Sequence, residues 1–175
     1  MASMEIILIK WEVNMKNLKA LILDVDGTLT DGGIYIGDNG EQFKQFHARD
    51  GYGIRHILPE LGIIPVIITG RQSKIVENRC KELGISVVVQ GVEDKCPAMV
   101  EILNDLGISP GEAAYMGDDL NDLECMKNVG IKACPKDAVD EIQNISDYVS
   151  SKDAGHGAVR DFIDWIKKNE KEIDS

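Results

Sequence analysis

Acidic side chains stand where two strongly apolar segments of the sequence end. One run leads into Asp24-Val25-Asp26-Gly27-Thr28, and a later run leads into Gly117-Asp118-Asp119. In an extended segment, residues i and i+2 share one side, so the carboxylates of Asp24 and Asp26 can converge. Carboxylate oxygens of this kind select a hard cation such as Mg²⁺.

A hydroxyl and an amine follow two further apolar runs. Thr69 ends the run 63–68, and Lys95 comes shortly after 87–89. Both side chains can hold the non-bridging oxygens of a phosphate, and a carboxylate beside a cation can attack phosphorus. A second carboxyl can protonate the leaving oxygen. The set predicts phosphoryl transfer through an aspartyl-phosphate. No Gly-x-x-x-x-Gly-Lys-[Ser/Thr] loop is present, which disfavours a P-loop nucleotidase.

The order of the segments predicts the fold that brings these side chains together. Strands are expected at residues 18–25, 63–68, 87–89, 113–116, 131–133 and 148–149, and helices at 50–58, capped by Asp50, and at 72–83, 97–106, 119–128, 138–143 and 157–168. A small β-hairpin is expected at 33–46, with its turn at Asn39-Gly40. The alternation predicts a doubly wound, Rossmann-like α/β domain with a parallel sheet, helices on both faces and a ligand site at the carboxyl ends of the strands.

Composition limits the partners. The 175 residues include 19 Lys and Arg against 30 Asp and Glu, a net charge of −11, which disfavours nucleic acid and anionic membrane surfaces. The apolar run 6–9 is too short for a membrane span. We therefore expect an N-terminal extension at 1–14 and one domain at 15–175, with a C-terminal tail at 151–175. Four cysteines without a C-x-x-C pair predict reduced thiols and a cytoplasmic protein.

These motifs resemble the four motifs of the haloacid dehalogenase superfamily of phosphohydrolases, over residues 18–166. The resemblance implies roles for seven residues: Asp24 as nucleophile, Asp26 as acid/base with a backbone carbonyl on Mg²⁺, Thr69 and Lys95 as phosphate ligands, Asp118 as a Mg²⁺ ligand, and Asp119 and Asp122 as supports for Lys95 or the metal. Many members insert a cap domain between motifs. Here the gaps of 45 and 26 residues leave no room for one. Because a phosphatase must control water at its site, a partner subunit is expected to close it.

Further stretches resemble the cap-less branch that acts on acidic keto-sugar phosphates. They are Thr30-Asp31-Gly32, residues 46–55, Thr69-Gly70-Arg71 and residues 155–160. The branch implies hydrolysis of 3-deoxy-D-manno-octulosonate 8-phosphate to the free sugar acid and phosphate, in a homotetramer whose hairpins form a small barrel. It also implies substrate contacts from Asp26, His47, Ala48, Arg49, Asp50, Gly51, Arg55, Arg71, Arg79 and Lys95, and a loop with His156 that reaches a neighbouring subunit.

Two positions depart from that branch, and other functions stay open. His47 stands where the branch often has asparagine, and His156 stands where a Gly-Gly-Arg-Gly loop has arginine. Alternatives are a nonulosonate 9-phosphate phosphatase, or the related domain joined to a sialic acid cytidylyltransferase. A phosphorylated receiver domain also uses Asp, Thr and Lys around Mg²⁺. Asp26 argues against the receiver, because an acid/base there allows rapid turnover of a phosphoaspartate.

Overall fold

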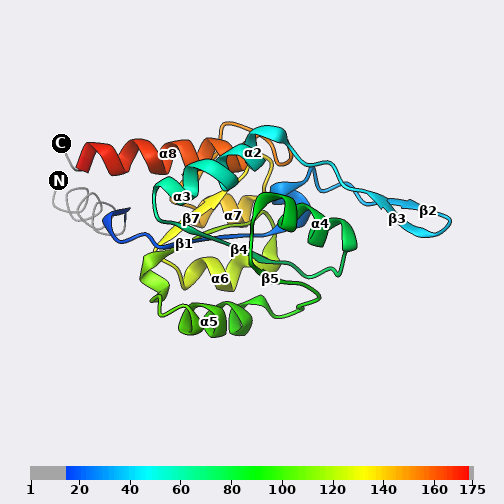
Figure 1. Cartoon of the computed structure of the whole chain (residues 1–175), viewed down its shortest axis with the longest axis horizontal. Coiled ribbons are helices and arrows are strands. Elements are labelled where there is room, and N and C mark those ends of the chain that lie inside the picture. Colours follow the sequence, from blue (N-terminus) through cyan, green and yellow to red (C-terminus); the bar gives the residue numbers. More distant parts are fainter. Residues whose placement is uncertain (1–14, 174–175) are drawn as a thin grey trace.

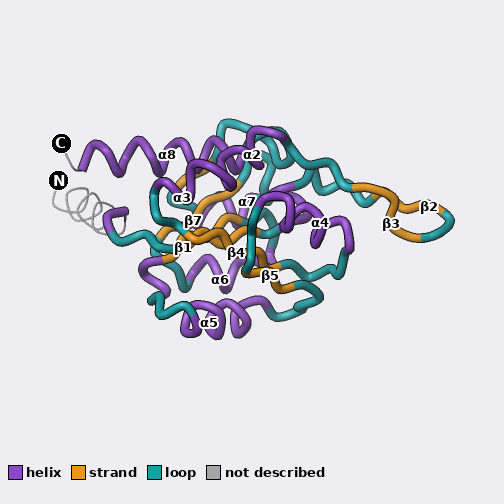
Figure 2. Tube along the Cα trace, in the orientation of Figure 1, coloured by secondary structure: helices purple, strands orange, loops and turns teal. Residues whose placement is uncertain are grey.

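A six-stranded parallel sheet forms the centre of the molecule (Figures 1 and 2). The computed structural model describes residues 15–173, so the extension predicted for residues 1–14 lies outside it. The strands follow the order β5-β4-β1-β6-β7-β8. Their bounds are β1 Ala20–Leu23, β4 Ile64–Ile68, β5 Val87–Val89, β6 Ala113–Met116, β7 Ile131–Cys134 and β8 Tyr148–Val149. This arrangement confirms the predicted doubly wound α/β class.

Helices cover both faces of this sheet (Figure 1). They are α2 Ala48–Tyr52, α3 Leu58–Glu60, α4 Lys74–Leu83, α5 Lys95–Asp105, α6 Leu123–Lys127, α7 Asp140–Ile145 and α8 Ala158–Ile173. Alternate residues of β1 enter two separate cores: Leu21 and Leu23 join the core under α4 and α8, whereas Ala20 and Ile22 join the core under α5, α6 and α7. The all-apolar sequence of β1 therefore follows from burial on both sides.

Several helix starts differ from the prediction. Asp50 does not cap the helix expected at 50–58, because α2 begins two residues earlier and His47 is its N-cap, with the ring Nδ1 accepting the Arg49 N–H at 3.3 Å. The chain then continues through a wider turn at Gly53–Ile57 into α3. The helix expected to begin near Pro97 begins at Lys95. The helix expected at 119–128 begins with a 3₁₀ turn over Leu120–Asp122, and α6 follows it.

The predicted hairpin projects from the body of the molecule (Figure 1). Its strands are β2 Tyr35–Gly37 and β3 Gly40–Phe43, and the rings of Tyr35 and Phe43 stack with centroids 4.3 Å apart. Ile36 and Phe43 are 68% and 55% exposed, so apolar surface remains uncovered on this element within one chain.

The C-terminal segment contributes to the core. Helix α8 buries Val159, Phe162, Ile163 and Ile166 against the sheet. The loop before α8 contains the exposed His156. Among residues 15–173, no helix is long and apolar enough to cross a membrane.

Candidate active site

Asp24 lies directly after β1, at the carboxyl edge of the sheet. Its strand pairs with β4 on one side and β6 on the other, so the segments that follow all three strands meet at this edge. Asp24 is 4% exposed, and its N–H donates to the Met116 carbonyl at 3.1 Å. Burial and the nearby Asp122 carboxylate raise the pKa of Asp24 to about 6, although Lys95 acts in the opposite direction. The ionised carboxylate therefore needs a cation beside it.

Lys95 supplies one such cation. Its Nζ lies 2.8 Å from an oxygen of Asp24 and 2.8 Å from an oxygen of Asp122, and its side chain is 1% exposed. Burial alone would lower the pKa of Lys95, but the charges and hydrogen bonds of the two carboxylates outweigh it and raise the pKa. Lys95 is thus a buried, charged donor beside Asp24, which is the geometry that a phosphate oxygen bound there requires.

Asp122 fixes this lysine and the loop after β6. One of its oxygens accepts from Lys95 and from the Tyr115 hydroxyl, the latter at 2.7 Å. Its other oxygen accepts the backbone N–H groups of Asp118 at 3.0 Å and Asp119 at 3.4 Å. Both oxygens are engaged, so Asp122 is placed to support the site, whereas the exposed Asp119 caps the turn by accepting the Leu120 N–H at 2.7 Å.

The carboxylates fit a divalent cation. One oxygen each of Asp24, Asp118 and Asp122 lies within 4.8 Å of the others. Burial and the charges of Asp24 and Asp122 raise the pKa of Asp118 to about 8, although the Thr28 hydroxyl donates to it at 3.0 Å. Lys95 contacts Asp24 and Asp122, and both oxygens of Asp122 are engaged. Asp24 and Asp118 are therefore the side chains with oxygens to offer a hard cation such as Mg²⁺.

Asp26 is held by a lysine that the sequence analysis did not identify. Lys44 follows β3, and its Nζ lies 2.5 Å from Asp26 Oδ1 and 2.9 Å from an oxygen of Glu41. Arg71 Nε lies 3.9 Å from the other oxygen of Asp26. A lysine on a projecting hairpin is typical of a solvated strand edge, so no sequence signal marked Lys44 as a buried residue.

Thr69 and Arg71 both lie near the carboxylates, but Thr69 is buried and Arg71 is half-exposed. Thr69 directly follows β4 at the same edge of the sheet, is 2% exposed, and donates its N–H to the Val89 carbonyl at 3.0 Å. Arg71 is half-exposed beside Asp26. Both positions agree with contacts to a bound phosphate ester, and those contacts stay predictions.

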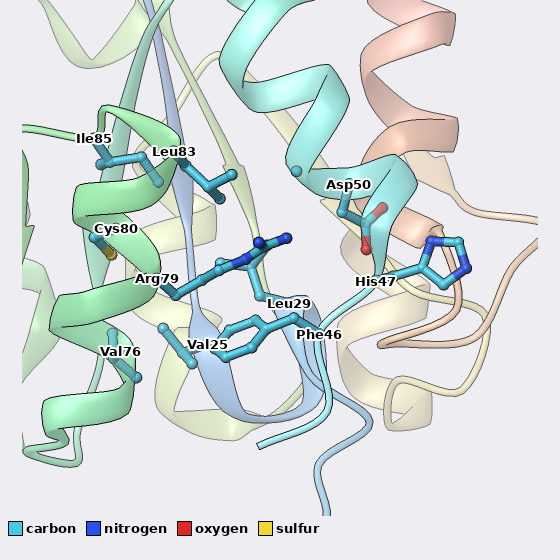
Figure 3. Close-up of a pocket in the computed structure, with 11 residues that line it drawn as sticks. Val25, Leu29, Phe46, His47, Asp50, Val76, Arg79, Cys80, Leu83 and Ile85 are labelled. Atoms are coloured by element: carbon cyan, nitrogen blue, oxygen red, sulfur yellow. The ribbon is translucent and has the colours of Figure 1, made fainter. Parts of the chain in front are cut away.

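Four other predicted contacts line a pocket between α2 and α4 (Figure 3): His47, Asp50, Gly51 and Arg79. Arg79 lies over the Phe46 ring at 5.5 Å and pairs with Glu82 at 2.9 Å, while Arg55 donates to the Glu82 carbonyl. Asp50 is buried and accepts the Arg160 N–H at 2.8 Å. Within one chain, these side chains pack the helices together.

The remaining predicted contacts lie near the N-terminus of α8. Arg49 and His156 line one surface hollow together with Lys152 and Arg160. His156 is exposed, and its ring lies 2.9 Å from the Ala154 carbonyl.

Ala48 and Gly51, two further predicted contacts, belong to α2. A side-chain carbon at Gly51 would lie 2.5 Å from Arg79 Nη2, so glycine at this position lets the arginine pass close to the helix.

Comparison with known proteins shows the family. Residues 87–163 match the haloacid dehalogenase-like hydrolase family. The chain is 45% identical over 159 residues, 91% of its length and 84% of the other protein, to the 3-deoxy-D-manno-octulosonate 8-phosphate phosphatase KdsC of Escherichia coli K12. The fold and site define a phosphotransfer enzyme, and the chain belongs to the haloacid dehalogenase-like hydrolases.

Two solved structures are similar over nearly the whole chain. One is the 3-deoxy-D-manno-octulosonate 8-phosphate phosphatase of Moraxella catarrhalis, crystallised with magnesium, phosphate and KDO. It has a TM-score of 0.87, 39% identity and 94% coverage of both chains. The other is the cobalt-bound form of the corresponding Haemophilus influenzae phosphatase, with a TM-score of 0.87, 35% identity, and coverage of 91% of this chain and 93% of that chain. The resemblance to this superfamily is therefore confirmed.

Proposed function

We propose that this protein is a Mg²⁺-dependent phosphatase that hydrolyses 3-deoxy-D-manno-octulosonate 8-phosphate to the free sugar acid and phosphate. The observation that carries the proposal is the buried Asp24–Lys95 pair at 2.8 Å with Asp118 beside it. The identity to a curated phosphatase of this substrate over most of the chain supports the substrate.

The residues of the site account for both halves of the reaction. Asp24 attacks phosphorus and becomes the aspartyl-phosphate, while Asp26 gives a proton to the leaving sugar oxygen. Asp26 then takes a proton from the water that hydrolyses the aspartyl-phosphate. Lys95 and Thr69 hold the phosphate oxygens. Mg²⁺, when bound by Asp24, Asp118 and the Asp26 carbonyl, neutralises charge on the phosphoryl group.

The substrate carries a carboxylate as well as a phosphate, and arginine suits both anions. Arg71 lies beside Asp26, where the leaving group would be, and Arg49 and His156 line a separate hollow near α8. The planar guanidinium matches planar anions through paired hydrogen bonds. In a chain of net charge −11, these local cations would attract an acidic sugar to the site.

The proposed active form is a homotetramer whose neighbouring subunits close each site. Support comes from the projecting hairpin, which leaves Ile34, Ile36 and Phe43 exposed to 43%, 68% and 55%. Contiguous exposed apolar groups on one element are typical of an interface. Sedimentation of the wild type and an Ile36→Glu variant tests this: a tetramer that dissociates in the variant supports the proposal, and a monomeric wild type would rule it out. The cytoplasmic location is also proposed, and four free cysteines support it.

The first experiment is phosphate release across a panel, with and without Mg²⁺. The panel contains octulosonate 8-phosphate, two nonulosonate 9-phosphates, a hexose 6-phosphate and 4-nitrophenyl phosphate. We expect a kcat/KM at least tenfold higher for octulosonate 8-phosphate, and no turnover in Asp24→Asn. A nonulosonate as the best substrate would keep the mechanism and overturn the substrate. Stable phosphorylation of Asp24 without release would instead identify a receiver domain.

A further inference from the structure

Lys44 is a buried charge that the phosphatase mechanism above does not use. Its side chain is 1% exposed although it directly follows β3, whose residues Gln42 and Phe43 are exposed. Burying an ammonium costs several kcal/mol unless carboxylates compensate it. Two carboxylates do so: Asp26 at 2.5 Å and Glu41 at 2.9 Å.

The second carboxylate is itself fixed to the body of the protein. Glu41 accepts a hydrogen bond from the hydroxyl of Ser73, the N-cap of α4. Burial raises the pKa of Glu41, but hydrogen bonds from Ser73 and Lys44 and the charges of Lys44 and Arg71 outweigh it, so the pKa is lowered. Glu41 is therefore an ionised anchor, and it places the Lys44 ammonium independently of Asp26.

We infer that Lys44 is a positioning residue for Asp26, anchored through Glu41 and Ser73, and that it aims the acid/base at the leaving oxygen. The inference rests on the proposed function, because it assigns Asp26 that role. The Lys44 contact fixes one oxygen of the Asp26 carboxylate, and Arg71 faces the other at 3.9 Å. The Asp26 side chain is 18% exposed, and without Lys44 it would keep Arg71 as its ion-pair partner at 3.9 Å, which is beyond hydrogen-bond distance.

Lys44 has two carboxylate partners, Asp26 and Glu41, and the role of Asp26 as the acid/base explains why. To act on the leaving oxygen, Asp26 must be able to turn from Lys44 toward the substrate. Glu41 keeps the Lys44 ammonium compensated when Asp26 does so. With Glu41 as a second counter-ion, Lys44 can orient Asp26 without locking it in a single ion pair.

The test compares substrates that differ in their need for an acid. The sugar alcohol of octulosonate 8-phosphate leaves only if it is protonated, whereas 4-nitrophenolate leaves without a proton. In Lys44→Met, which keeps the length and apolar stem, we expect kcat/KM to fall at least tenfold for the sugar phosphate and less than threefold for 4-nitrophenyl phosphate. KM should stay within threefold of the wild type, and Lys44→Arg should restore part of the rate.

A double-mutant cycle separates action through Asp26 from direct action. In an Asp26→Asn background, measured with 4-nitrophenyl phosphate, Lys44→Met should change kcat/KM by less than twofold. Lys19→Met is the matched control. Lys19 lies just before the start of β1, at the opposite edge of the sheet, and it forms a 2.6 Å ion pair with Glu112. This control should leave both substrates unchanged.

Distinct results would overturn the inference. An equal loss for both substrates would indicate a structural role, and a rise in KM that persists in Asp26→Asn would indicate direct contact with the substrate. Wild-type rates in Lys44→Met would show that Lys44 is a bystander. If the wild-type enzyme itself releases no phosphate from either substrate, the proposed function fails, and the role of Lys44 fails with it.

Discussion

Lys95 and Asp122 form a 2.8 Å ion pair between two side chains that are 1% and 0% exposed. The pair joins the first residue of α5 to the turn after β6, and Lys95 extends from it to Asp24. Buried ion pairs are stable only when further hydrogen bonds satisfy the charges. Asp122 meets this condition, since it accepts from Tyr115 and from two backbone N–H groups as well.

Replacing Asp122 should therefore damage both stability and catalysis. In Asp122→Asn, Lys95 keeps only Asp24 as a counter-ion, and the new amide cannot accept all the donors that face the carboxylate. We expect the free energy of unfolding to fall by about 3–5 kcal/mol. The kcat should fall at least tenfold, because Lys95 is no longer fixed. Urea denaturation and phosphate release measure the two effects.

Tyr115→Phe is the matched control for this prediction. It removes one hydrogen bond to Asp122 and leaves the Lys95 ion pair in place. The expected loss is about 1.5–3 kcal/mol, the usual range for a hydrogen bond to a charged group. If Asp122→Asn were no less stable than Tyr115→Phe, the ion pair would not be the main contribution of Asp122.

Binding of Mg²⁺ should release protons near neutral pH. In the metal-free protein, burial and neighbouring carboxylates raise the pKa of Asp24 to about 6 and of Asp118 to about 8. At pH 7, Asp118 is then largely protonated, and a cation can bind only after that proton leaves. Titration calorimetry in buffers of different ionisation enthalpy measures the release. We expect Mg²⁺ affinity to rise from pH 6 to pH 8.5.

The same pKa shifts determine how the stability of the metal-free protein changes with pH. A carboxyl whose pKa is raised in the folded state destabilises the fold most strongly above that pKa. The penalty shrinks as the pH falls below it and is gone only below the ordinary pKa of the group. The metal-free protein should therefore melt at a lower temperature at pH 8.5 than at pH 6.5. Saturating Mg²⁺ should remove most of that difference. A melting temperature that is independent of pH in both states would contradict this assignment.

The sequence allowed the sheet and its catalytic edge to be predicted from two simple patterns. Buried parallel strands appear as apolar runs, and each predicted strand of the main sheet overlaps a strand of the structure. Because carboxyl ends of neighbouring strands share one edge, the convergence of Asp24, Lys95 and Asp118 followed from their positions. Helix starts were less accurate: His47 caps α2 although aspartate, the residue type of the expected cap Asp50, is the preferred N-cap type.

Contacts made by distant segments could not be predicted in this way. Tyr115 lies within an apolar strand, and only the fold reveals that its hydroxyl reaches Asp122. Lys44 directly follows the second strand of a projecting hairpin, yet its side chain is buried in an ion pair with Asp26, in the segment after β1. Arg55 and Arg79 both contact Glu82 within the chain, and their contacts with substrate stay predictions.

Asp50 should contribute a pH-dependent penalty to stability. Burial raises its pKa to about 6, although the Arg160 N–H and the charges of His47, Arg79 and Arg160 act in the opposite direction. Above about pH 6 the folded protein therefore carries the ionised form at its full cost in stability, and this cost shrinks as the pH falls toward the ordinary pKa of an aspartate. Asp50→Asn keeps an oxygen for the Arg160 N–H and cannot ionise. Its stability relative to the wild type should rise by up to roughly 3 kcal/mol between pH 4 and pH 7.

Urea denaturation across this pH range tests the prediction against a surface control. Asp164 pairs with Arg160 on the exposed side of α8, with 52% of its side chain accessible. Asp164→Asn should change stability by less than about 1 kcal/mol at each pH. A constant difference between Asp50→Asn and the wild type at every pH would show that Asp50 ionises in the fold as it does in water.

Gly27 should be intolerant of alanine because of its closeness to Asp118. Its φ of +90° lies in the region that favours glycine, and a Cβ there would lie 2.1 Å from Asp118 Oδ2. In Gly27→Ala, the carboxylate must turn away from the position where it would bind a cation. We expect Mg²⁺ affinity to fall at least tenfold and kcat/KM to fall with it.

Gly62→Ala separates this effect from backbone strain: Gly62 has a φ of +68° with nothing within 4 Å of an added Cβ. That control should lose about 1–2 kcal/mol of stability while keeping its Mg²⁺ affinity. Equal Mg²⁺ affinities in the two variants would show that Asp118 does not depend on the space left by Gly27.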